Sequence, residues 1–286
     1  IGAKSGRMSC NNPPLQAMPG SSREFFIAEK GHKLVCADYS QVELRVLASI
    51  SGDENLINYF KNSVDLHTGT ASLVFKKAIE EVTKEERQVA KSLNFGIVYG
   101  ITAYGIQKNL RRSGLEVTLE EAEDYRLEFL RVYPKVRELQ DSLLRADCIR
   151  SLGWRRWQGS NLSMTQRLNL PIQGSAAEGL KEALALLVEK MKDSWRLVVV
   201  VHDEILLEVP DDEAEEAKNI LTEYILFIFL GNFRAEYHSQ RATHIIVRII
   251  RTKQQFFAAE TVDKRFYSNN FLKITGIDIE ILIRLY

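Results

Sequence analysis

The chain has 286 residues, of which 45% are hydrophobic and 27% charged, and its 38 basic and 38 acidic residues leave no net charge. That composition is ordinary for a globular protein with a large core. It neither favours nor excludes a nucleic-acid partner, whose basic surface would have to be local. No membrane-spanning apolar run and no signal peptide is visible, and three scattered cysteines argue against a disulfide framework or a zinc site. A reducing compartment is therefore expected. Because the chain begins with Ile1 rather than methionine, we expect a fragment or a processed product.

The first regular element follows an irregular opening rich in Gly, Ser, Asn and Pro. Residues 33–37 predict a short apolar strand that ends at Asp38, and a helix is predicted from Val42 with Ser40 as its cap. Asp38 then lies at the end of a strand beside the start of a helix. Such strand ends are frequent positions for ligand sites.

A second helix is predicted from the capping box Thr83-Lys84-Glu85-Glu86 to about Gly100. At roughly 100° per residue, one arc of this helix carries two cations followed by two aromatic rings, opposite an apolar side. The four residues of the arc are Arg87, Lys91, Phe95 and Tyr99. Cations suit the phosphates of a nucleoside triphosphate, and flat rings suit its sugar and base. A solvated charged face is the alternative, and it is disfavoured because the aromatic residues continue the same arc.

The middle of the chain reads mainly as scaffold. Residues 118–147 predict an amphipathic helix or helical pair, which begins at a second capping box formed by Thr118 and Glu121 and is interrupted by Pro134. Residues 151–157 combine arginines with tryptophans, which suits contact with a nucleic-acid backbone, although surface cation–π packing explains them equally well. A further helix is predicted over residues 169–191, where Asn169 and Gln173 are neutral donors suited to the groove edges of DNA.

Residues 197–210 predict a β-hairpin. Four consecutive valines in its first strand are typical of a strand buried on both faces, and the second strand alternates apolar residues until Pro210 ends it. The tip, His202-Asp203, is a poor choice for a tight turn, which normally takes Asn-Gly or Asp-Gly. Such local misfits often mark functional sites. The alternative is that Asp203 only caps the turn.

Asp38 and Asp203 together suggest a metal site. Both are flanked by strands and could meet at one edge of a sheet. Two adjacent carboxylates repel each other unless a cation lies between them. Mg²⁺ prefers one or two carboxylates together with substrate phosphates. The pair therefore fits a two-metal phosphoryl-transfer site.

These segments resemble the family A DNA polymerases, the bacterial DNA polymerase I group, over about residues 1–225. Three stretches carry the resemblance to the first palm motif, the fingers helix and the second catalytic palm motif, in that order: Asp38-Tyr39-Ser40-Gln41-Val42-Glu43-Leu44-Arg45, Arg87 through Gly100, and Val201-His202-Asp203-Glu204. The resemblance implies an α+β fold, with an antiparallel palm sheet covered by helices and a helical fingers subdomain. The palm would comprise residues 1–65 and 151–225 and the fingers residues 66–150, while residues 226–286 form an atypical tail without assignment.

The resemblance also implies a function. That function is template-directed DNA synthesis, in which deoxynucleoside triphosphates are added to a primer 3′ end with two Mg²⁺ ions. The expected partners are primer–template DNA and dNTPs, for a monomer without membrane association that acts in DNA replication or repair. The expected location is the cytoplasm of a bacterial or phage-infected cell, with an organelle as the alternative.

Individual roles follow from the same resemblance. The metals would be held by Asp38, Asp203 and Tyr39. The catalytic residues would be the two aspartates and Lys91. The primer or template would be contacted by Arg7, Asn169, Gln173 and His202. The nucleotide would be bound by Arg87, Lys91, Phe95, Tyr99, His67, Glu43 and Gln41. Lys91 would also protonate the leaving group. Glu43, hydrogen-bonded to Tyr99, would exclude a ribose 2′-hydroxyl, and a phenylalanine at position 95 is associated in this family with rejection of dideoxynucleotides.

The chain departs from the family pattern in three places. The family usually has an asparagine at the position of Ala17 and an arginine at that of Thr165, with Arg167 close but out of register. After Tyr224 the closing palm strand with its tryptophan is replaced by unrelated sequence. We expect this replacement to leave an edge of the palm sheet unpaired, with exposed apolar segments such as residues 245–247, and we expect primer–template to bind weakly.

Two other functions remain open from the sequence. A truncated, non-catalytic polymerase remnant with weak nucleic-acid binding is favoured by the atypical tail and an expected lack of a thumb, and opposed by the intact catalytic residues. A metal phosphohydrolase would need several further histidines in helices, and the chain has five in all.

Overall fold

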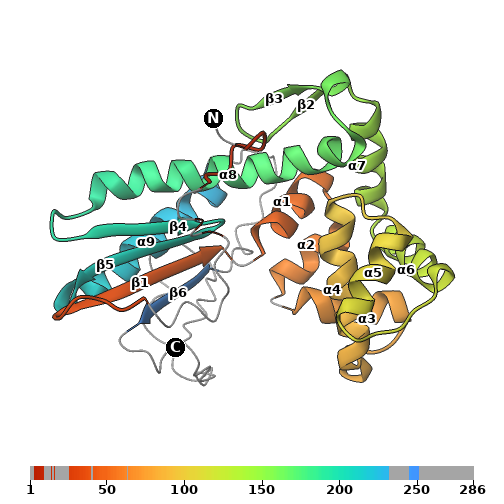
Figure 1. Cartoon of the computed structure of the whole chain (residues 1–286), viewed down its shortest axis with the longest axis horizontal. Helices are drawn as coiled ribbons and strands as arrows, with labels where there is room; N and C mark the ends of the chain where they lie inside the picture. The colour runs from red at the N-terminus through yellow and green to blue at the C-terminus, as the bar shows by residue number, and fades with distance from the viewer. Residues whose placement is uncertain are drawn as a thin grey trace. The chain divides into compact units, whose positions relative to one another are not determined.

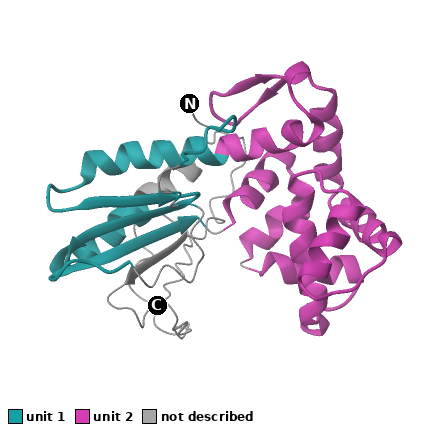
Figure 2. Cartoon of the chain, viewed as in Figure 1, with its two compact units in different colours: residues 1–40, 176–286 teal, residues 41–175 magenta. Residues whose placement is uncertain are grey.

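The computed structural model describes residues 3–9, 14, 16, 26–39, 41–62, 64–231 and 245–250, with the backbone alone for residues 224–231 and 245–250. The chain divides into two compact units, one formed by residues 1–40 and 176–286 and the other by residues 41–175 (Figure 2). Antiparallel strands and helices confirm the expected α+β class. None of the helices in these ranges is long and apolar enough to cross a membrane.

The first unit is built on a four-stranded antiparallel sheet in the order β4-β5-β1-β6 (Figure 1). Its strands are β1 (His32–Tyr39), β4 (Arg196–Val201), β5 (Glu204–Pro210) and β6 (Ile245–Ile250). The helix α9 (Ala214–Gly231), which a single 3-10 turn (Asp211–Glu213) precedes, packs against β1, β5 and β6.

The side chains of β1 and β5 alternate between two faces, as strand geometry requires. One face is wholly buried and carries Val35, Ala37, Ile205, Leu207 and Val209, each 0% exposed. The opposite face carries a small apolar cluster of Leu34, Cys36 and Leu206. Asp38 and Glu204 continue that second face toward the hairpin tip, because they stand directly opposite each other in the register.

The second unit is mainly helical. Its helices are α1 (Val42–Ser51), α2 (Glu54–Lys61), α3 (Leu66–Phe75), α4 (Lys84–Val98), α5 (Ala103–Arg112), α6 (Leu119–Val132) and α7 (Pro134–Arg145), with the short hairpin β2 (Cys148–Arg150) and β3 (Arg156–Gln158). Two 3-10 turns, Ile79–Glu81 and Gly159–Asn161, connect them. The capping boxes predicted at Thr83 and Thr118 are both formed, and the predicted helical pair is interrupted at Pro134. The long helix α8 (Met164–Lys190) contributes residues to both units.

Two predictions about strands are wrong. The valine strand β4 is not buried on both faces: Leu197 and Val198 are 40% and 42% exposed, because β4 is an edge strand among the described strands. The edge of β1 is not left unpaired, because β6 pairs with it from Leu34↔Ile250 to Tyr39↔Ile245. Strand propensity reveals neither the position of a strand within its sheet nor its partner.

One helix cap and one helix start also differ from the prediction. Helix α1 begins at Val42 as expected, but its N-cap is Gln41, with a left-handed φ of 56° and no side-chain cap; Ser40 lies outside the described residues. Helix α8 begins at Met164 rather than near residue 169, and Pro171 lies inside it. Its start is capped by Ser163 and Gln166, each of which accepts a hydrogen bond from the other's backbone N–H.

Candidate active site

The hairpin of β4 and β5 brings the two predicted motifs together. Val201 pairs with Glu204, so the loop contains only His202 and Asp203, and His202 has a φ of 55°. Asp38 pairs with Glu204 in the neighbouring strand, and the backbone N–H of Tyr39 donates to the carbonyl oxygen of Asp203 at 3.3 Å. Asp38 and Asp203, far apart in the sequence, therefore lie at the same end of adjacent strands.

Glu204 is a third carboxylate at this end, and it was not among the predicted site residues. Directly opposed residues of an antiparallel pair carry their side chains on one face, so Glu204 and Asp38 share a face. The thiol of Cys36, two residues before Asp38, donates to Glu204 Oε1 at 2.8 Å. The motif Val-His-Asp-Glu contains this glutamate, but its position opposite Asp38 depends on a strand register that no single motif reveals.

The donor set at this end fits a hard divalent cation. Within the described residues, no group of three or more His, Cys, Asp and Glu side chains is placed to hold a metal ion. Mg²⁺ does not require such a cage, because it takes one or two carboxylates and completes its shell with water and phosphate oxygens. Burial, and after it the negative charges of Asp203 and Glu182, raise the pKa of the Tyr39 phenol, which therefore stays protonated. Tyr39 can thus offer a metal only its backbone carbonyl.

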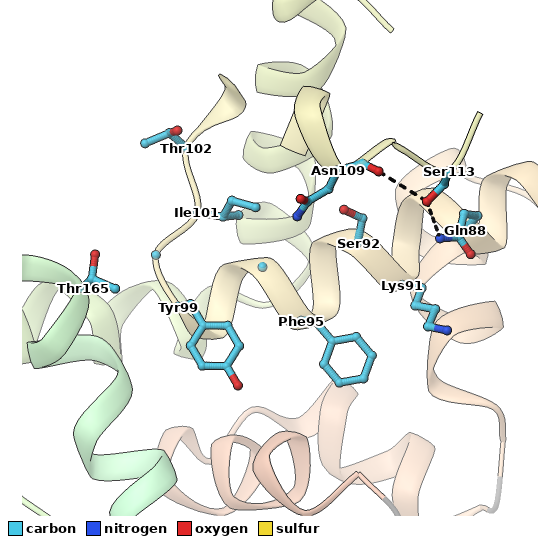
Figure 3. A pocket seen from close by; sticks show the side chains of 12 residues that line it. Gln88, Lys91, Ser92, Phe95, Tyr99, Ile101, Thr102, Asn109, Ser113 and Thr165 are labelled. Carbon is cyan, nitrogen blue, oxygen red and sulfur yellow. Dashed lines mark hydrogen bonds between the residues drawn. The ribbon is translucent and has the colours of Figure 1, made fainter. Parts of the chain in front are cut away.

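The predicted arc of α4 is present. Val89, Ala90, Leu93 and Ile97 are buried. Lys91 and Phe95 are exposed, and together with Tyr99 they project from the same side of the helix (Figure 3). A pocket of about 710 Å³ adjoins these side chains (Figure 3). Its remaining wall is mostly polar, with Gln88, Ser92, Asn109 and Ser113 among the lining residues. The helix thus presents a cation and two aromatic rings beside a hollow surface.

Arg87 is held by an acid of the neighbouring helix. Its Nε and Nη2 donate to Oδ2 and Oδ1 of Asp65 at 2.9 and 3.0 Å. Asp65 is also the N-cap of α3, and its side chain accepts from the backbone N–H of Thr68. The fork is about 40% exposed on both sides. Exposed ion pairs stabilise a fold little, so the main effect of this pair is to fix the direction of the guanidinium.

Two further predicted residues, on the neighbouring helices α1 and α3, each contact one of the aromatic rings of the arc. Glu43, on α1, is buried and accepts a hydrogen bond from the hydroxyl of Tyr99, as the sequence resemblance implied. His67, on α3, is 4% exposed and tilts against the ring of Phe95, with 5.5 Å between ring centroids. Burial, opposed by the negative charge of Asp65, lowers the pKa of His67 to about 4, and its imidazole is therefore neutral at pH 7.

Comparison with known proteins assigns the chain to a family. Residues 1–228 match the family model for DNA polymerase family A. The chain belongs to DNA polymerase family A. It is 37% identical over 243 residues to DNA polymerase I of Caldicellulosiruptor bescii, a match that covers 77% of this chain and 28% of that protein. It is 38% identical over 233 residues to DNA polymerase I of Aquifex aeolicus, with 77% and 40% covered. The chain thus spans well under half the length of these curated relatives.

A solved structure is also similar to this chain. It is the POL domain of Pol1 from M. smegmatis in complex with DNA primer-template and dNTP. The TM-score is 0.75 at 29% sequence identity, and the match covers 88% of this chain and 46% of that chain. The likeness extends the family assignment from sequence to fold.

The residues that the family resemblance gives to DNA contact are scattered over the chain. Arg7 lies in the opening segment and is half-buried, and His202 is exposed at the hairpin tip. Asn169 and Gln173, four residues apart on α8, share a face of that helix and are half-buried. The contacts of these four residues with DNA stay predictions. Gln41, which the resemblance gives to nucleotide binding, is the N-cap of α1, and its role also stays a prediction.

Two departures from the family A pattern have structural consequences. Thr165, where the family usually has an arginine, lines the pocket beside α4. Arg167 does not replace that arginine, because its Nη1 donates to the carbonyl oxygens of Leu144 and Ala146 at 3.0 and 2.9 Å and so caps the end of α7. Ala17 lies outside the described residues.

Proposed function

We propose that this chain performs template-directed DNA synthesis, adding deoxynucleoside triphosphates to a primer 3′ end by two-metal phosphoryl transfer. The observation that carries the proposal is the meeting of Asp38 and Asp203 at one end of adjacent strands, in the motifs that characterise the family. Primer–template DNA and dNTP as partners are supported by the complex in which the similar POL domain was solved.

The carboxylates would hold the cations and the reacting ends of the substrates. Mg²⁺ ions bound there would acidify the primer 3′-hydroxyl and neutralise charge on the pyrophosphate. Asp38 and Asp203 would be the ligands, with the Tyr39 carbonyl completing the set. Glu204 lies on the same face as Asp38 and adds negative potential there. A cation would therefore bind more tightly than it would to the two aspartates alone.

The exposed arc of α4 would bind the incoming nucleotide. Lys91 is unburied and able to reach phosphate oxygens, and it would donate a proton to the leaving pyrophosphate. Asp65 fixes the direction of the Arg87 guanidinium and uses two of its five N–H donors. The remaining donors of Arg87 would contact the phosphates. The ring of Phe95, 39% exposed, would stack against the sugar and base.

Asp38→Asn and Asp203→Asn test the proposal. Each removes a ligand charge without changing shape, so primer extension in Mg²⁺ should fall roughly a thousandfold, corresponding to several kcal/mol of transition-state stabilisation. The urea midpoint should stay level or rise, because repulsion between the carboxylates is relieved. Asp193→Asn, at an exposed aspartate of the same unit, is the matched control and should extend primers normally.

Three outcomes distinguish the proposed polymerase from the alternatives. Extension by either aspartate variant at the parental rate would rule out these residues as metal ligands. A parent that binds primer–template but does not extend it would favour the non-catalytic remnant. Loss of extension in the aspartate variants alone supports the proposal.

A further inference from the structure

A chain of four buried polar side chains runs through the helical unit behind the nucleotide-binding arc. It joins Tyr133, Thr70, Asn94 and His67, of which the first three are wholly buried. The Tyr133 and Thr70 hydroxyls lie 2.8 Å apart, Thr70 Oγ1 donates to Asn94 Oδ1 at 3.1 Å, and Asn94 Nδ2 lies 3.0 Å from His67 Nδ1. These hydrogen-bonded side chains connect the α6–α7 junction with α3 and α4. Buried polar groups are costly unless satisfied, and here each satisfies the next.

With Asn94 Oδ1 facing Thr70, donor count determines the direction of every other hydrogen bond in this network. The single hydroxyl proton of Thr70 goes to Asn94 Oδ1, so Thr70 must accept from Tyr133. Burial raises the pKa of the Tyr133 phenol, so its hydroxyl stays protonated and can donate a hydrogen bond to Thr70. With its oxygen facing Thr70, Asn94 turns its amide nitrogen toward His67. An amide nitrogen only donates, so His67 Nδ1 must present a lone pair.

We propose that Asn94, oriented by Thr70 and Tyr133, is a positioning residue that holds His67 as the neutral Nε2–H tautomer, so that His67 presents one fixed donor to a phosphate oxygen of the incoming nucleotide. The inference rests on the proposed function for its ligand, but not for the tautomer itself. Nε2 makes no hydrogen bond to any described residue, and the ring lies against Phe95, on which the nucleotide would stack.

The surrounding charges favour a neutral donor over a cation. Burial has the largest effect and lowers the pKa of His67. The negative charge of Asp65 opposes it, and the positive charges of Arg87 and Lys91 lower the pKa further. An imidazolium would also carry a proton on Nδ1, facing the amide N–H of Asn94. Relief of that contact would require the amide to turn and to lose its bond with Thr70. Arg87 and Lys91 supply the positive charge for the phosphates, and His67 supplies direction.

Thr70→Val and Thr70→Ser separate this role from simple packing. Valine keeps the shape of Thr70 but removes the donor that orients Asn94, whereas serine keeps the hydroxyl. In the full chain labelled with ¹⁵N-histidine, the ring nitrogen shifts of His67, assigned by their loss in His67→Gln, should show Nε2–H in the parent and in Thr70→Ser. Thr70→Val should show protonated Nδ1 as well, because the amide is free to turn.

Asn94→Asp tests the same point if Thr70→Val folds poorly. Its carboxylate accepts from both neighbours and should place a proton on His67 Nδ1. A parent protonated on Nδ1 at pH 7 would overturn the proposal, as would either Thr70→Val or Asn94→Asp with the parental nitrogen shifts.

The functional arm uses single-nucleotide primer extension. Thr70→Val should raise the KM for dNTP roughly fivefold and leave kcat within about twofold, because a ground-state hydrogen bond is weakened. Thr70→Ser should keep the parental KM. An altered tautomer with an unchanged KM would overturn the role in nucleotide binding. A parent without polymerase activity would instead contradict the proposed function, and the nitrogen shifts would still decide the tautomer.

Discussion

At the scale of single residues, the buried contact between Glu43 and Tyr99 leads to a prediction about sugar selection. Glu43 is 8% exposed, and the Tyr99 hydroxyl holds its carboxylate. If this carboxylate occupies the space of a ribose 2′-hydroxyl, Glu43→Ala should raise ribonucleotide incorporation relative to deoxynucleotide by about tenfold or more, the effect of a kcal/mol or two of lost steric exclusion. The measurement is the ratio of kcat/KM for the two nucleotides in single-nucleotide extension.

Glu43→Gln is the matched control for that prediction, because it keeps the volume and still accepts from Tyr99. Selectivity should then remain close to parental. Phe95→Tyr places a hydroxyl on the exposed ring and should raise dideoxynucleotide incorporation without affecting ribonucleotides. Selectivity ratios unchanged in both Glu43→Ala and Phe95→Tyr would mean that the α4 assignments are wrong even if the aspartates hold metal.

The buried imidazole of His67 leads to a prediction about acid stability. Its folded-state pKa of about 4 lies below the usual 6.5, so the unfolded chain binds more protons between these values, and the free energy of unfolding falls as the pH falls. Between pH 7 and pH 5 this single group should remove about 2 kcal/mol. Urea unfolding of the parent and of His67→Gln at both pH values measures it. An equal fall in both proteins would show that His67 is not the group responsible.

At the scale of elements, helix starts could be predicted where the capping signal is local. Thr83 with Glu86, and Thr118 with Glu121, were read correctly, because a capping box is complete within four residues. Ser163 and Gln166 form an equivalent box, which the predicted start of α8 near residue 169 missed. A proline disfavours a helix interior, yet the long apolar face of α8 outweighs that cost.

The strands were harder to place because their environment is not local. The four valines identified β4 as a strand but not as an edge strand. In the same way, the hairpin tip marked Asp203, whereas the opposition of Glu204 and Asp38 needed the register between β1 and β5. The buried hydrogen-bonded side chains that end at His67 come together only when their helices pack. The spacing of Thr70, Asn94 and Tyr133 in the sequence does not predict them.

At the scale of the whole molecule, the segment after Tyr224 contributes a strand to the four-stranded sheet. Although its sequence departs from the family pattern, β6 pairs with β1 along Leu34–Tyr39, the strand that carries Asp38. A chain that ends after Gly231 would expose this edge. We expect it to lose on the order of 3 kcal/mol or more of unfolding free energy through the lost ladder hydrogen bonds, and to self-associate through the open edge.

A chain that ends after Ile250 is the control for that truncation, because it keeps β6 and lacks only residues 251–286. Urea unfolding and sedimentation velocity of the two truncated chains and the full chain make the comparison. The chain that ends after Ile250 should unfold at nearly the parental urea concentration and sediment as the parent does, whereas the one that ends after Gly231 should unfold earlier and form larger species. If both truncated chains were equally stable and equally monomeric, β6 would contribute nothing to the sheet, and the edge of β1 would need no partner from this segment.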